Sequence, residues 1–281
     1  MMKKSDFYVG VPIFNRMALL QLLIPNWERA GLLTRNDDGC QFCLFDDAST
    51  EFSGEVIQQL FKPYCNVTYY RNPINLKADK NLYTIFTNFL QSDKKALFIS
   101  DSDLLISPRM MDFVCTHFEK TDGVLTVFNT INSHPALAIV DNCFVLKEHV
   151  GAAGCIISRQ RVEQFLKKFS HIQMVEGIDW QFSAYFNEEG IKILSTLNSF
   201  AQHLGFSGQN SSSLSGDYGA NFVIEDPRDG QILNDAIFNA QDHFKNSGYV
   251  EIRNLLHSLV TKRKRRKDWF KRLLTKIRNC F

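Results

Sequence analysis

The most constraining feature of this sequence is a short apolar run that recurs four times and each time ends at polar side chains. We predict these runs to be β-strands, and they span residues 7–14, 41–45, 67–70 and 96–99. Patterns of helical period separate them, over residues 17–30, 53–61 and a stretch that ends at Leu90. Strands that alternate with helices in this way form βαβ units. The sequence therefore predicts an α/β fold with a mostly parallel central sheet flanked by helices.

Side chains that can bind a ligand follow every one of these predicted strands. They are Asn15 and Arg16, Asp46 and Asp47, Arg71 and Asn72, and Asp101 and Asp103. In open α/β sheets, ligands bind at the carboxyl ends of the strands. We therefore expect these side chains to converge on one edge of the sheet.

The pair Asp101 and Asp103 lies directly after the apolar run 96–99. Burying two like charges in a core is costly, so the pair is expected at the end of the strand. Residues two apart in an extended segment point the same way, and both carboxylates could reach one cation. Such oxygen ligands suit Mg²⁺ or Mn²⁺ held together with substrate phosphates. An isolated Asp-x-Asp is a weak signal, because it also occurs in surface turns.

With these motifs in place, residues 6–210 resemble nucleotide-sugar glycosyltransferases of the GT-A fold, family 2, of the bacterial surface-glycan (lipopolysaccharide or capsule) type. The segments that carry the resemblance are Val11-Pro12-Ile13-Phe14-Asn15-Arg16, Asp46-Asp47-Ala48-Ser49-Thr50, Asp101-Ser102-Asp103, Gly151-Ala152-Ala153-Gly154, Glu176-Gly177-Ile178-Asp179 and Gln202-His203-Leu204-Gly205. The resemblance implies a GT-A catalytic domain over 1–220, with a nucleotide-binding half to about residue 105 and an acceptor half after it.

The resemblance also implies a nucleotide site. Pro12, Asn15 and Arg16 would belong to its first strand and loop, and Asp46 or Asp47 would accept the N–H of the base. Ser102 lies between the two metal-binding carboxylates and is included in this site. Lys77 and Arg71 could contact phosphate, and surface salt bridges are the alternative for both.

The metal and the general base are assigned from the same resemblance. Asp101, Asp103 and His203 would hold Mn²⁺ or Mg²⁺, and an ordinary half-buried histidine is the alternative for His203. Asp179 would be the catalytic base, with Glu176 second. The alternative for Asp179 is an acid that complements the dipole of a helix N-terminus.

The sequence departs from the family pattern in several places. Ala48 stands where the family commonly has Gly, the stretch 74–81 lacks an expected Gly, and Glu176 and Asp179 are three apart rather than adjacent. The absence of a Gln-x-x-Arg-Trp motif argues against a processive polysaccharide synthase.

The last part of the chain has a different character. Residues 221–260 are polar and partly helical, whereas residues 262–281 hold ten Lys or Arg and one Asp, which leaves the rest of the chain at −7. Apolar residues recur at helical spacing from Trp269 onward, which is typical of a basic amphipathic helix at a membrane interface. Packing of this helix on the body, or a nucleic-acid-binding arm, are the alternatives, although we expect no nucleic acid partner.

The seven scattered Cys and the lack of an N-terminal apolar segment favour the cytoplasm. Segment 261–281 would attach the protein to the inner face of the cell membrane. The expected partners are a UDP-sugar donor, a lipid-linked saccharide acceptor and an anionic membrane surface. The predicted function is metal-dependent, inverting transfer of a hexose. A nucleotidyltransferase and an inactive membrane-bound scaffold of the same fold remain as alternatives.

Overall fold

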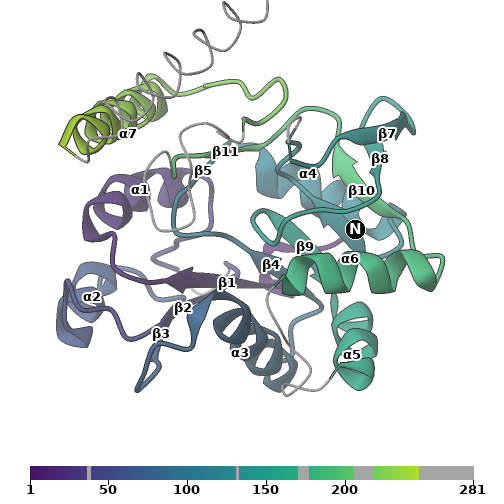
Figure 1. Ribbon diagram of the computed structural model, residues 1–281, viewed down its shortest axis with the longest axis horizontal. Coiled ribbons are helices and arrows are strands. Elements are labelled where there is room, and N and C mark those ends of the chain that lie inside the picture. The colour runs from purple at the N-terminus through teal and green to yellow at the C-terminus, as the bar shows by residue number, and fades with distance from the viewer. Residues whose placement is uncertain (37–38, 131–132, 170–176, 206–217, 247–281) are drawn as a thin grey trace, which may run out of the picture.

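The computed structural model describes residues 1–36, 39–130, 133–169, 177–205 and 218–246. In this part of the chain, nine strands form one sheet in the order β3-β2-β1-β4-β9-β6-β10-β8-β7 (Figure 1). These strands are β1 (Phe7–Ile13), β2 (Gln41–Asp46), β3 (Val67–Arg71), β4 (Ala96–Ile99), β6 (Val124–Thr126), β7 (Ala136–Ile139), β8 (Phe144–Lys147), β9 (Cys155–Ser158) and β10 (Ile193–Thr196). Only β9 and β8 run against the others, so seven of the nine strands point the same way. The predicted mostly parallel sheet is confirmed.

Helices cover both faces of this sheet (Figure 1). They are α1 (Met17–Arg29), α2 (Gly54–Phe61), α3 (Lys77–Gln91), α4 (Met110–His117), α5 (Arg159–Lys168), α6 (Ile178–Glu188) and α7 (Pro227–Asn246), with single 3₁₀ turns at Lys4–Asp6 and Phe118–Lys120. Alternation along β1 explains the two layers, because successive side chains of a strand point to opposite faces. Phe7, Val9 and Val11 enter the core formed with α1, α2 and α4, whereas Tyr8 enters the core formed with α3, α5 and α6.

Gly10 and Pro12 of β1 are explained by their places in the sheet. A Cβ at Gly10 would lie 2.4 Å from Cγ2 of Ile85, so only glycine lets α3 approach the strand this closely. Pro12 lies beyond the last residue of β1 that pairs with β4, and its missing N–H therefore removes no bond on that side.

A second, two-stranded antiparallel sheet joins β5 (Leu104–Ile106) to β11 (Ala201–His203). Helix α1 holds the other edge of β5. The Asn26 side chain donates to Ile106 O and accepts from Ile106 N, both at 2.8 Å, and Trp27 Nε1 donates to Leu104 O. Helix α1 thus satisfies backbone groups of Leu104 and Ile106 on the edge of β5 that does not pair with β11.

Some predicted elements are different in the structure. The helical pattern predicted over 17–30 is one helix, Met17–Arg29, which contains Pro25. Residues 150–154 form a loop, and strand β9 follows it at Cys155–Ser158. Strands β5 and β8 and helix α4 were not predicted.

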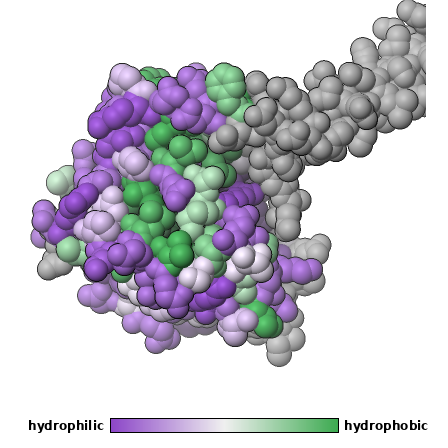
Figure 2. Space-filling model, turned by 90° about the vertical axis from the view of Figure 1, so that its left-hand side faces the viewer, coloured by the Kyte–Doolittle hydropathy of each residue, from purple (hydrophilic) through white to green (hydrophobic). Residues whose placement is uncertain are grey.

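Figure 2 looks onto the side that carries α1, α2 and α7, and hydrophobic side chains gather in the middle of this face among hydrophilic ones. Leu19 and Leu22 of α1 are partly buried hydrophobic residues of this layer. Within the described ranges no helix combines the length and apolar character that crossing a bilayer requires. Glu176 and the basic segment 261–281 lie outside the described residues.

Candidate functional site

The small sheet β5–β11 brings two of the predicted metal ligands together. Asp103 directly precedes β5, and His203 ends β11, where it pairs with Leu104. Leu204 N donates to Asp103 O at 2.8 Å and closes this end of the sheet. Asp101 follows β4 after one residue, Ser100, so the end of the large sheet and the small sheet meet at these three side chains.

Asp101, Asp103 and His203 form a group suited to a divalent cation. One ligand atom from each lies within 4.8 Å of the others. Among the described residues, Asp103 Oδ1 is buried and accepts no hydrogen bond, although His203 Nε2 lies 3.1 Å away as an ion pair. A buried carboxylate oxygen with so few partners is suited to bind a cation. The two carboxylates and one imidazole therefore fit Mn²⁺ or Mg²⁺, as the donor types predict.

The three groups shift one another's protonation. Burial, reinforced by the charge of Asp103, raises the pKa of Asp101 to about 6. Burial opposes ionisation of Asp103 as well, but the charges of His203 and Arg16 outweigh it and lower the pKa of Asp103. For His203 burial favours the neutral ring, yet the two aspartates raise its pKa above the usual value. The carboxylates of the site thus lie beside the Arg16 guanidinium and an imidazole that is protonated more readily than usual.

Arg16 belongs to the same site. Its Nη1 forms an ion pair with Asp103 Oδ2, and the Asp103 side chain is only 2% exposed. Spacing in the sequence gives no sign of this pairing, because 87 residues separate the two. The residue was predicted to belong to the nucleotide site, and in the loop after β1 it also contacts Asp103, a candidate metal ligand.

The predicted base-binding carboxylates are buried and hold the loops around them. Asp46 accepts from Tyr69 Oη at 2.6 Å, from Arg71 Nη1 at 2.7 Å and from Ser49 N at 2.8 Å. Arg71 therefore forms a salt bridge with Asp46. A salt bridge was the alternative to a predicted phosphate contact for this residue. Asp46 keeps little accepting capacity for a base.

Asp47 organises the loop that enters α3. Its oxygens accept from Asn72 Nδ2 at 2.9 Å, Leu76 N at 2.7 Å and Lys77 N at 2.8 Å. Lys77 itself is exposed at the first position of α3, with its side chain on the surface. Ser102 is buried between the two metal-site carboxylates.

Non-glycine residues with left-handed backbone gather at this edge. They are Asn15 (φ 59°), Arg16 (φ 64°), Ala48 (φ 59°) and Lys77 (φ 67°), with Asn221 elsewhere. Such conformations persist where the surroundings hold them, and they cluster at binding sites. Glycine adopts a left-handed φ without steric cost, which explains why the family that the sequence resembles commonly has Gly at the position of Ala48.

Asp179 lies in the first turn of α6, close enough to the metal site for its charge to raise the pKa of Asp101. Burial raises the pKa of Asp179 itself, opposed by the backbone N–H of Trp180, which donates to Oδ1 at 2.9 Å. Asp79 of α3, which sequence reasoning missed, holds this helix end by accepting from Gly177 N at 2.8 Å and Ile178 N at 3.2 Å. A carboxyl with a raised pKa beside a metal site is suited to proton transfer.

An aromatic surface adjoins Asp179. Trp180 is 53% exposed, and its ring centroid lies 4.2 Å from that of His149, which in turn contacts His134 with 2.6 Å between their Nδ1 atoms. A Cβ at Gly151 would lie 3.3 Å from His134 Nε2 and 4.0 Å from Asp179 Oδ2. Nothing in the sequence pattern indicated that these histidines and Trp180 come together.

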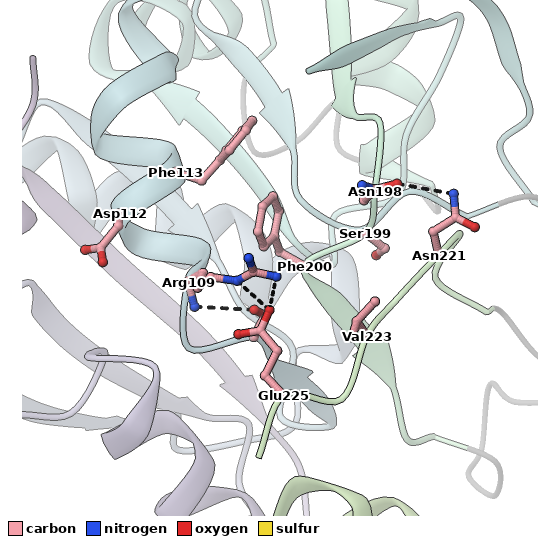
Figure 3. Close-up of a pocket in the computed structure, with 10 residues that line it drawn as sticks. Arg109, Asp112, Phe113, Asn198, Ser199, Phe200, Asn221, Val223 and Glu225 are labelled. Carbon is pink, nitrogen blue, oxygen red and sulfur yellow. Dashed lines mark hydrogen bonds and ion pairs between the residues drawn. The ribbon is translucent and has the colours of Figure 1, made fainter. Parts of the chain in front are cut away.

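A cavity of about 400 Å³ lies away from the metal group, at the opposite end of the β5–β11 sheet (Figure 3). Phe113 and Phe200 line it, and Arg109 Nε donates to Glu225 Oε1 at 2.5 Å across its rim. The cavity lies at one end of strands β5 and β11, and Asp103 and His203 lie at the other. A strand of three residues is about 10 Å long. It contributes no side chain to the metal site.

Comparison with known protein families gives one match: the model described as glycosyl transferase family 2 covers residues 8–176. This match includes Asp101, Asp103 and the loops around Arg16 and Asp46, but it ends before Asp179 and His203. No curated protein sequence matches the chain.

Solved structures share the fold. A mannosyltransferase from Pyrobaculum calidifontis in complex with GDP-Man and Mn²⁺ is 14% identical, with a TM-score of 0.51, over 69% of this chain and 55% of that one. GalNAc-T7 with UDP, GalNAc and Mn²⁺ is 10% identical, with a TM-score of 0.51, over 68% of this chain and 41% of that one. S. aureus TarS 1-349 in complex with UDP-GlcNAc is 15% identical, with a TM-score of 0.50, over 86% and 74%. The chain thus spans about half the length of the first two, and the likeness concerns the GT-A fold.

Proposed function

Because this chain belongs to glycosyl transferase family 2, we propose that it transfers a sugar from a nucleotide-sugar donor to a saccharide acceptor in a reaction that needs a divalent cation. One observation carries the proposal: Asp101, Asp103 and His203 offer ligand atoms within 4.8 Å of one another at the carboxyl edge of the sheet. When bound there, Mn²⁺ or Mg²⁺ would neutralise the charge that develops on the departing diphosphate.

The residues around this group would hold the donor. Asp46 and Asp47 fix the loops 49–52 and 72–77 beside the site, and the backbone that they order would surround the base and ribose. Lys77, exposed at the start of α3, is the remaining candidate for a phosphate contact. UDP is the expected nucleotide, and it occurs in the complexes of two similar structures, whereas a third contains GDP-Man.

Asp179 is the proposed general base. The acceptor hydroxyl would lose its proton to the Asp179 carboxylate as its oxygen forms a bond to the anomeric carbon. The bond from that carbon to the diphosphate breaks at the same time, and the nucleoside diphosphate departs with the electron pair. Attack from the face opposite to the leaving group inverts the anomeric centre. The exposed face of Trp180, next to Asp179, offers an apolar surface on which an acceptor sugar could stack.

The acceptor is proposed to be lipid-linked, as in assembly of a bacterial surface glycan. Segment 261–281, with its cations and helical apolar stripe, supports attachment to the inner face of the cytoplasmic membrane. A hexose is the proposed sugar.

Thermal unfolding with nucleotide and metal tests the proposal. A ligand that binds only the folded state raises the midpoint by mass action. We expect UDP with Mn²⁺ to raise it by several degrees, and UDP without metal to raise it little. Asp101→Ala should abolish the metal-dependent part. If neither UDP nor GDP shifts the midpoint with any divalent cation, the proposed donor site is wrong.

A second variant separates catalysis from binding. Asp179→Asn should keep the UDP–Mn²⁺ stabilisation and lower release of UDP from UDP-sugars by about 10²–10⁴-fold, the range for a lost general base. Full activity of this variant would exclude Asp179 as the base. If the protein is an inactive scaffold, both the wild-type protein and Asp179→Asn would bind the nucleotide, and neither would release UDP from any nucleotide sugar.

A further inference from the structure

The guanidinium of Arg16 lies among the candidate metal ligands. Its Nη1 forms an ion pair with Asp103 Oδ2, and its charge also acts on Asp101 and His203. A cation of the protein itself therefore neutralises the carboxylate that a metal ion would bind. In the described part of the chain, Asp103 has no other cationic partner than Arg16 and His203.

The backbone of Arg16 is fixed, whereas its side chain is partly open to solvent. Asn15 N donates to Ser49 Oγ at 2.8 Å, and Asn15 Oδ1 accepts from the backbone N–H groups of Thr50 at 2.8 Å and Glu51 at 3.1 Å. The Arg16 side chain is 29% exposed, against 2% for Asp103. The long side chain can thus leave Asp103 without any movement of the loop that carries it.

A divalent cation and this guanidinium would repel each other at the distances of the site. The repulsion is strong because burial lowers the local dielectric screening. A nucleoside diphosphate brings negative charge to the same place, and guanidinium groups bind phosphate oxygens in bidentate fashion. The diphosphate could therefore receive Arg16 as the metal ion takes over Asp103.

We propose that Arg16 makes metal binding depend on the nucleotide: it occupies Asp103 in the free protein and transfers to the diphosphate when metal and nucleotide bind together. The metal ion alone then binds weakly, and nucleotide and metal raise each other's affinity by the same factor. That the diphosphate is the group which receives Arg16 rests on the proposed function. The competition between Arg16 and the metal ion for Asp103 does not.

Titration with Mn²⁺, followed by the electron paramagnetic resonance signal of the free ion, tests this directly. Arg16→Gln should bind Mn²⁺ at least tenfold more tightly than the wild-type protein when no nucleotide is present. With saturating UDP, R16Q and the wild-type protein should bind Mn²⁺ with similar affinity, because the variant has lost its contact with the phosphate. The factor by which UDP tightens Mn²⁺ binding should therefore fall in R16Q.

Arg71→Gln is the matched control. It removes an arginine from another buried aspartate at the same edge, Asp46, which is not a candidate ligand. When no nucleotide is present, its Mn²⁺ affinity should equal that of the wild-type protein. The proposal is overturned if R16Q binds Mn²⁺ no more tightly than the wild-type protein without nucleotide, since Arg16 would then serve the fold alone. It is also overturned if R71Q shows the same gain.

A measurement on the wild-type protein guards against failure of R16Q to fold. The Arg Nε–H signals in nuclear magnetic resonance spectra should be unchanged by Mg²⁺ alone, and one should shift with Mg²⁺ and UDP together. A shift with Mg²⁺ alone of the same size would overturn the proposal. If UDP never binds, but R16Q still gains Mn²⁺ affinity, the donor site is wrong while the competition at Asp103 stands.

Discussion

Asp101 shows how a candidate metal ligand can weaken the fold that carries it. Burial and the neighbouring Asp103 raise its pKa to about 6 from 3.8. Because the folded pKa lies above the unfolded one, the charged carboxylate is disfavoured by folding. The loss of stability is absent below about pH 4, grows as the pH rises toward 6, and is complete above that value. The charges of His203 and Arg16 act in the opposite direction on Asp101 and offset only part of this rise.

Asp101→Asn should therefore raise the free energy of unfolding of the metal-free protein at pH 7.5. A pKa difference of this size corresponds to about 3 kcal/mol as an upper limit. The gain should vanish near pH 4, and urea denaturation at the two pH values measures both. Asp93→Asn is the control, because that side chain is 88% exposed. A D101N protein of lower or equal stability at pH 7.5 would contradict the pKa assigned to Asp101.

At the scale of elements, the sequence was sufficient for the first half of the sheet. Strands β1 to β4 are apolar runs of four to seven residues, long enough to be predicted with their ligand-bearing ends. Strand β5 has three residues and its partner β11 begins at Ala201, so no local pattern could reveal the sheet that joins them. The assignment of His203 came from family resemblance. The contacts of Arg16 with Asp103 and of Asp79 with α6 depend on packing between distant segments, which spacing does not encode.

Gly205 tests whether the β5–β11 sheet sets the metal site. A Cβ there would lie 2.3 Å from His203 Cε1 and 2.5 Å from Asp103 Oδ2, so one of the two must move. Gly205→Ala should weaken Mn²⁺ binding in the presence of UDP at least tenfold, measured by titration. Gly230→Ala in α7 meets only ordinary contacts, at 3.6 Å from Ile224. This control should keep the affinity and gain about 0.5–1 kcal/mol of stability. Unchanged affinity of G205A would show that the ligands do not depend on this geometry.

At the scale of the whole molecule, the charges are unevenly divided. Segment 262–281 carries +9 and the remainder −7, so a net charge of +2 conceals two parts of the sequence with opposite charge. Each Lys or Arg near an anionic leaflet contributes about 1 kcal/mol, and salt screens the attraction. The acidic remainder would be repelled by the same surface, which would favour binding through the basic segment alone.

Sedimentation with lipid vesicles measures this. The full chain should bind vesicles that contain phosphatidylglycerol, bind neutral phosphatidylcholine vesicles weakly, and dissociate as salt is raised. A chain that ends at residue 260 should lose the binding and keep its UDP–Mn²⁺ stabilisation, which shows that it still folds. Equal binding by both chains would refute the membrane role of 261–281. Binding to DNA stronger than to vesicles would favour the nucleic-acid alternative.

The pairing of β5 with β11 also has a consequence for how the protein is made. His203 follows Asp103 by one hundred residues, and both must be present before the metal group exists. A nascent chain that has emerged only to residue 176 would contain the whole family match, yet it would lack half of the small sheet and one ligand. Synthesis would thus complete the nucleotide side of the sheet well before the ion could be held. The newly made chain would acquire the ability to bind the ion only after His203 has emerged from the ribosome.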